Sequence, residues 1–95
     1  MAHPQSRQEL HAAWRQRVNR ARQRYKQQVA ICVELQAERL LAYRMPSLPD
    51  PDGMLGLNQA LRAERDALKE LTRVTRIYLD LLKHGTVPDE DPDSA

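Results

Sequence analysis

One row of apolar residues runs through the first half of the chain with the spacing of a single long helix. Steps of four, four and three from Leu10 reach ten positions, nine of them apolar. The average step of about 3.67 residues is close to the period of a straight α-helix. Ser6 and Glu9 have capping-box spacing, and Pro46 stops the helix. We predict a helix over 7–45 whose row is Leu10, Trp14, Val18, Ala21, Tyr25, Val29, Cys32, Gln36, Leu40 and Tyr43.

A proline-rich stretch over 46–53 separates this helix from a second apolar pattern. Three prolines and one glycine in the stretch forbid continuation of the helix and supply turn geometry. A helix is predicted over 54–84, with Gly53 and Gly56 weakening its first turn and Gly85 able to form a left-handed cap. Its main row is Leu57, Leu61, Glu64, Leu68, Leu71, Thr75, Tyr78 and Leu82, and a second row is Ala60, Ala67, Val74 and Leu81.

These patterns predict an all-α fold consisting of one long antiparallel helical hairpin over 7–84. Residues 1–6 are expected to form a flexible N-terminus. The acidic tail, residues 85–95, has almost no apolar content to bury, so we expect it to be disordered.

The predicted helices are more apolar around their circumference than a two-helix pair requires. The second helix carries two rows, and 29–33 is apolar nearly all the way round. An isolated pair needs only a narrow seam. We therefore predict that two hairpins associate as a homodimer, an antiparallel four-helix bundle.

Two polar residues interrupt the predicted apolar rows. Folding the chain at the loop places Gln36 and Glu64 at about the same level. They are candidates for a buried polar layer that would fix the register of the helices, as a buried polar residue does in coiled coils. The alternative is that one or both lie at the edge of the seam.

The charge is distributed unevenly along the chain. Residues 7–26 hold seven basic residues and one acidic residue, a local balance of +6, whereas the bases and acids of 27–84 cancel. The acidic tail carries a balance of −4. The hairpin brings this tail to the same end as the basic segment. The tail is therefore either a solubilising segment or one that folds back and competes with an anionic partner.

The basic segment has the chemistry of an anion or nucleic-acid contact. Arginine binds phosphate bidentately, and clustered cations release counterions from nucleic acid. A helical wheel divides the cluster between the two flanks of the apolar row, which is also typical of a solvated surface. The candidate contact residues are Arg15, Arg17, Arg20, Arg22, Arg24 and Lys26.

No recognisable motif for catalysis or cofactor binding is present. The sequence has no P-loop, dinucleotide fingerprint, paired metal-ligand spacing or nucleophile–base constellation. We therefore expect no enzyme activity, cofactor or metal. The first residues are polar, and no apolar run approaches the ~20 residues needed to cross a bilayer, so we expect neither a secretory leader nor a membrane span. We expect a cytoplasmic protein.

The sequence favours a small non-enzymatic helical module for oligomerisation and protein interaction. We expect the chain to form a homodimer and to bind a protein partner, and we expect no association with a membrane. The alternative is a sequence-tolerant nucleic-acid-binding protein that uses the basic half of the first helix.

Overall fold

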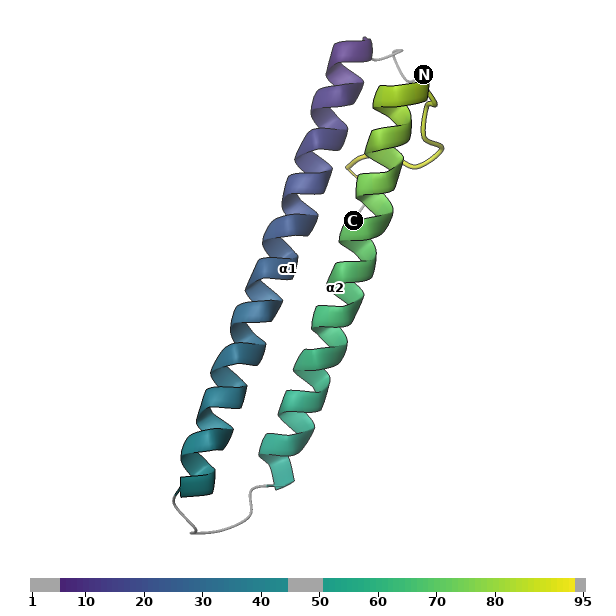
Figure 1. The fold of residues 1–95 in the computed structure, drawn as a ribbon. Coiled ribbons are helices and arrows are strands. Elements are labelled where there is room, and N and C mark those ends of the chain that lie inside the picture. Colours follow the sequence, from purple (N-terminus) through teal and green to yellow (C-terminus); the bar gives the residue numbers. More distant parts are fainter. Residues whose placement is uncertain (1–5, 45–50, 94–95) are drawn as a thin grey trace.

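The chain folds as an antiparallel helical hairpin (Figure 1). The computed structural model describes residues 6–44 and 51–93. In these ranges the chain forms the helices α1 (Arg7–Arg44) and α2 (Pro51–His84) and no strand. The molecule measures 62 × 25 × 15 Å, so the hairpin is a single layer of helices. The predicted all-α hairpin is confirmed.

The N-terminus of α1 is capped as the sequence predicts. The Glu9 amide donates to Ser6 Oγ at 3.2 Å, and the Leu10 amide donates to the Ser6 carbonyl oxygen at 3.0 Å. The hydroxyl thereby satisfies an amide that has no partner inside the helix. The helix ends at Arg44, one residue before the predicted boundary. Residues 46–50 of the predicted loop lie outside the described residues, as does residue 45.

The second helix begins at Pro51, three residues earlier than predicted. Proline suits the first helical position, because its missing N–H has no helical partner there and its φ is already helical. Gly53 and Gly56 are therefore accommodated inside α2. The helix ends with Gly85 at φ 65°, whose amide donates to the Leu81 carbonyl oxygen at 3.0 Å. This is the left-handed cap that the sequence predicts.

The core lies in the half of the hairpin that holds the chain termini. Trp14 and Val74 are fully buried, and the cluster around them is completed by Val18, Ala21 and Leu81. On the described part of α2, the buried residues are those of the predicted second row together with Leu57, and Leu71 and Tyr78 of the main row pack against the core. Other members of the main row lie to one flank, where Leu68 and Leu82 are exposed. None of the described helices is long and apolar enough to cross a membrane.

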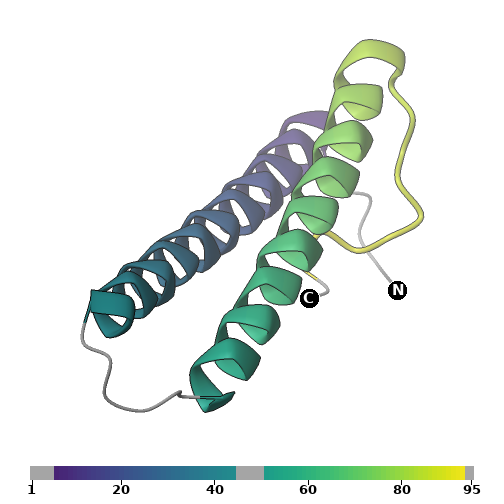
Figure 2. The same ribbon diagram turned by 60° about the horizontal axis from the view of Figure 1, so that its bottom comes forward.

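The acidic tail turns back along the hairpin after Gly85 (Figure 2). It has no regular secondary structure, but Pro92 is buried and the Asp93 amide donates to Asp91 Oδ1 at 2.9 Å. Over residues 85–93 this arrangement differs from the disordered tail that the composition predicts. Composition counts only the tail's own apolar content, whereas the partners here are arginines of the two helices.

Candidate functional site

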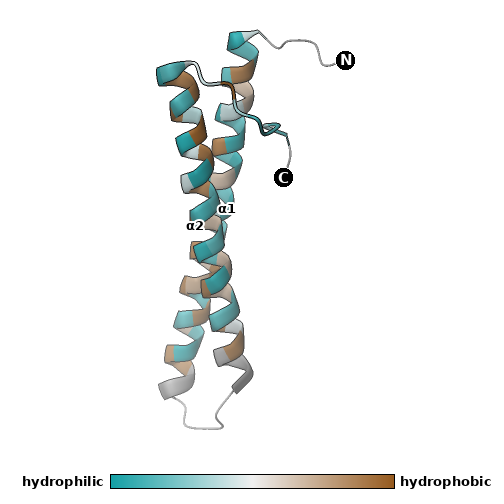
Figure 3. Ribbon diagram, turned by 90° about the vertical axis from the view of Figure 1, so that its right-hand side faces the viewer, coloured by the Kyte–Doolittle hydropathy of each residue, from teal (hydrophilic) through white to brown (hydrophobic). Residues whose placement is uncertain are grey.

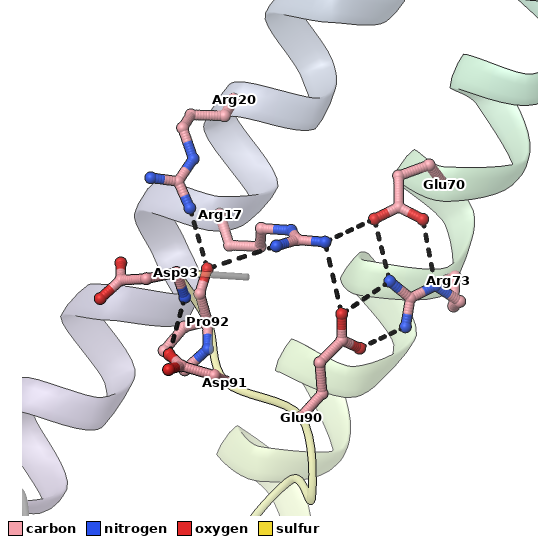
Figure 4. A network of polar contacts seen from close by, with 8 residues as sticks. All are labelled: Arg17, Arg20, Glu70, Arg73, Glu90, Asp91, Pro92 and Asp93. Carbon is pink, nitrogen blue, oxygen red and sulfur yellow. Dashed lines mark hydrogen bonds and ion pairs between the residues drawn. The ribbon is translucent and has the colours of Figure 1, made fainter. Parts of the chain in front are cut away.

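Arg17 is a buried cation at the centre of a polar network between the helices and the acidic tail (Figure 4). Its side chain is only 7% exposed. Nη2 donates to Glu70 Oε1 at 2.8 Å and to Glu90 Oε1 at 3.4 Å. Nη1 lies 3.5 Å from the carbonyl oxygen of Pro92, at the limit of hydrogen bonding. A buried guanidinium needs such partners to offset its lost hydration.

Arg73 binds both carboxylates of the same network. Its Nε and Nη2 donate to the two oxygens of Glu70 at 3.1 and 2.9 Å. Nη2 also donates to Glu90 Oε1 at 3.0 Å, and Nη1 donates to Glu90 Oε2. Both pairings are bidentate, the geometry in which an arginine–carboxylate contact is strongest. We call Arg17, Glu70, Arg73 and Glu90 the arginine network.

The network shifts the pKa values of Glu70, Arg73 and Glu90. Hydrogen bonds from Arg73 and Arg17 lower the pKa of the Glu70 carboxyl. The hydrogen bond from Arg73 likewise lowers the pKa of Glu90. In return, the hydrogen bonds to Glu90 and Glu70 raise the pKa of Arg73, and the one to Glu90 has the larger effect. Each shift favours the charged form. At neutral pH the network therefore consists of two cations and two anions, with one of the anions supplied by the tail.

A second contact fixes the tail to α1. Arg20 Nη2 donates to the Pro92 carbonyl oxygen at 2.8 Å, and that oxygen also faces Arg17. Nearer to the end of α2, the tail does not pack closely against the helix. A hollow of about 240 Å³ separates them there, lined by Ile77, Asp80, Thr86, Pro88, Asp89 and Glu90.

The hairpin has two broad sides with different polar contacts. Arg17 and Glu70 meet on the side that the tail covers, which we call the tail face. Arg15 Nε donates to the Tyr78 hydroxyl at 3.3 Å, and this contact raises the pKa of Arg15. At 100° per residue, Arg15 and Arg17 lie on opposite flanks of the α1 row that contacts α2. The Arg15–Tyr78 contact therefore marks the other side, which we call the opposite face.

The structure does not gather the six candidate cations into one surface. Arg17 and Arg20 contact the tail, while Arg24 lies one turn beyond them on the same flank. The remaining three lie on the flank of the opposite face. Within the described part of the chain, no hydrogen bond or ion pair joins the exposed residues Arg22, Arg24 and Lys26 to another residue.

Gln36 and Glu64 do not form a buried polar layer. Gln36 is exposed, because the buried side of α1 drifts away from it after Cys32. Glu64 is half-buried and accepts a hydrogen bond from the Cys32 thiol. Burial and this contact raise the pKa of Cys32, so the thiol stays protonated.

Sequence reasoning missed three members of the site: Glu70, Arg73 and Pro92. One signal was present, because the three-residue spacing of Glu70 and Arg73 on a helix allows an ion pair. The convergence of Arg17 and Glu90 on that pair depends on how α1, α2 and the tail are placed, which spacing along the sequence does not specify.

No cluster of three or more potential ligands from His, Cys, Asp or Glu could hold a metal ion among the described residues. The chemistry of the site is thus that of guanidinium groups, which can bind carboxylates, carbonyl oxygens and phosphates. The chain has no significant match among models of protein families, curated proteins or solved structures.

Proposed function

We propose that the chain is a non-enzymatic interaction module that self-associates through its opposite face into an antiparallel four-helix bundle. The observation that carries the proposal is a row of exposed apolar residues on that face. Both helices contribute to it, and hydrophobic positions recur along the coloured parts of both ribbons (Figure 3). A single layer 15 Å thick leaves such a row in contact with water.

On α1 the row occupies the half nearer the loop. Arg15, Arg22, Lys26, Val33 and Leu40 share one flank, within an arc of about 40° on a helical wheel. Because Arg15 contacts Tyr78, this flank belongs to the opposite face. Val33 is 58% exposed and Leu40 is 67% exposed. The same stripe of α1 is therefore basic near the termini and apolar near the loop.

On α2 the row runs nearly the whole length of the helix. It consists of main-row residues together with Leu79 and lies on the flank away from Glu70 and Arg73, hence on the opposite face. Its exposed members lie from the middle of the helix to its C-terminal end, and half-buried Leu61 extends the row toward the loop. The exposed members are Leu68, Leu79 and Leu82.

A second copy of this chain is the occupant that the opposite face fits. The hairpin is 62 Å long and 25 Å wide, which is more than enough for the ~800 Å² that each partner buries in a typical stable complex. A copy supplies a row of the same length through a two-fold axis. Antiparallel stacking also keeps Arg15 and Arg22 of one copy away from those of the other, whereas parallel stacking brings like charges together.

The test is the solution mass of the full chain and of two matched variants. Leu68 and Ile31 are equally exposed, at 44% and 43%, but Ile31 lies on the flank of the tail face. Multi-angle light scattering at micromolar concentration should give a two-chain mass for the wild type and for Ile31→Glu. Leu68→Glu should give a one-chain mass with its helicity retained. A one-chain wild type, or equal behaviour of the two variants, would refute the proposal.

Nucleic-acid binding is the second candidate function. The observation that favours it is the exposure of Arg22, Arg24 and Lys26, which are not engaged by other described residues. Binding to random duplex DNA should weaken steeply with salt and should depend on these cations. If replacing all three with glutamine leaves the affinity unchanged, they are not the contact surface.

A further inference from the structure

On the tail face, the arginines of α1 and α2 that contact the tail outnumber the helical carboxylates that pair with them. Arg17 and Arg73 share one helical carboxylate, that of Glu70, and, among the described residues, Arg20 donates to the tail alone. Without the tail, these four helical residues carry a net charge of +2, and the further carboxylate of Asp80 lies at the hollow. Buried Arg17 would keep only one of its three acceptors. Such a site is complete only when an acidic segment fills it.

The acidic tail shows what kind of ligand the site accepts. The Glu90 carboxylate lies on Arg73 in a bidentate pairing. Two residues later, the Pro92 carbonyl oxygen accepts from Arg20, and the proline itself is buried. A carboxylate, a main-chain carbonyl and a buried proline ring are features of a peptide. A phosphate backbone offers only the anionic part.

The tail is also held in a way that allows its replacement. Hydrogen bonds between the described residues join the tail to the hairpin at Glu90 and Pro92, and a hollow of about 240 Å³ lies behind the segment that leads there. Glu90 and Arg73 are 29% and 45% exposed, so solvent screens their pairing. The tail gains its occupancy from its covalent connection, which gives it a high effective concentration at the site.

We infer that the tail face is a binding site for an extended acidic segment of a partner protein with a Glu-x-Pro pattern, which the acidic tail occupies in its absence. Arg73 binds the glutamate, and Arg17 and Arg20 bind the carbonyl oxygen of the proline. The site lies on the side opposite the proposed dimer interface. Its occupancy is therefore independent of self-association, and the two proposals fail separately.

The test measures binding of a fluorescent peptide with the sequence of residues 86–95 to the full chain. In the variant Glu90→Gln the tail competes less, so the peptide should bind about tenfold more tightly than to the wild type. Adding Arg20→Gln to that variant should weaken the peptide about fivefold, the loss of one charge-assisted hydrogen bond. Adding Arg24→Gln should change the affinity less than about twofold, since Arg24 bears the same charge one turn away from the tail.

Two further probes separate a peptide site from a general anion site. A scrambled peptide of equal composition should bind at least about fivefold more weakly, because it lacks the Glu-x-Pro order. A single-stranded oligonucleotide of equal charge should compete poorly. The inference is overturned if the wild type and Glu90→Gln bind the peptide equally, if the scrambled peptide binds as well, or if the oligonucleotide competes fully. Equal losses from Arg20→Gln and Arg24→Gln would overturn it too.

Discussion

The half of the hairpin near the chain termini and the half near the loop consist of the same two helices but bury very different side chains. Near the termini, Trp14 and Val74 are fully buried. Near the loop, the buried residues that the structure describes are the small Cys32 and Ala60 together with Leu57, while Leu40 is 67% exposed. Two helices alone bury only the side chains between them, so large residues elsewhere need a third partner.

The segment that packs against the two helices as a third partner differs between the two halves. Near the termini, the acidic tail lies over the tail face and its carboxylate joins the arginine network. Near the loop, no other part of the described chain covers Val33 or Leu40. The tail face of the terminal half is therefore covered from within the chain, and our account assigns the exposed apolar residues of the opposite face, which include Leu82 in the terminal half and Leu40 in the loop half, to a second copy.

The largest difference between the halves should appear when one large apolar residue is removed from each. Trp14→Ala should lower the free energy of unfolding by about 3–5 kcal/mol, because it leaves a cavity at the centre of the core. Leu41→Ala should change it by less than about 0.5 kcal/mol, since Leu41 is exposed and lies on the side of α1 away from α2. Urea unfolding at one fixed protein concentration measures both. Similar losses would contradict the contrast between the halves.

A smaller effect is expected from the polar part of the terminal half. Arg17→Gln should destabilise the chain by about 1–3 kcal/mol, because it leaves half-buried carboxylates with fewer donors. The matched variant Arg24→Gln removes the same charge from an exposed position on the same flank and should cost less than about 0.5 kcal/mol. Thermal unfolding followed by circular dichroism compares the two. Equal costs would mean that the network adds nothing to stability.

The smallest effect is the release of the tail by acid. The pKa values of Glu70 and Glu90 are lowered in the folded state, so their contribution to stability is fully present above the ordinary glutamate pKa. This contribution to stability is lost as the pH falls from about 4.5 through the lowered pKa values of Glu70 and Glu90. The Nη1–H NMR signal of Arg73, the group that donates to Glu90 Oε2, should move toward that of a free arginine over this range, while that of exposed Arg76 stays constant. A constant Arg73 signal down to pH 3 would contradict the assigned pairing.

The sequence predicts the helices well because their signals are local. The Ser6 cap, the Gly85 cap and the apolar rows each depend on residues within a few turns of one another. The sequence does not predict the start at Pro51, because two nearby glycines disfavour helix there. In the structure, the preference of proline for the first helical position outweighs the helix-weakening effect of the glycines.

The candidate site depends on signals that are not local. The helical wheel places Arg17 on a flank but does not show that Glu70 stands opposite it and Glu90 returns to it. The buried pairing of Gln36 with Glu64 was wrong for a related reason. The buried side of α1 drifts along the helix, so that Cys32 takes the place beside Glu64.

Small-angle X-ray scattering of the full chain at micromolar concentration tests the central claim, self-association through the opposite face, most directly. Side-by-side antiparallel stacking predicts a two-chain mass with a particle length that stays close to the 62 Å of one hairpin. A one-chain mass would contradict self-association. A two-chain mass in a particle of nearly doubled length would place the contact at the ends of the hairpin and would contradict the face that we assign.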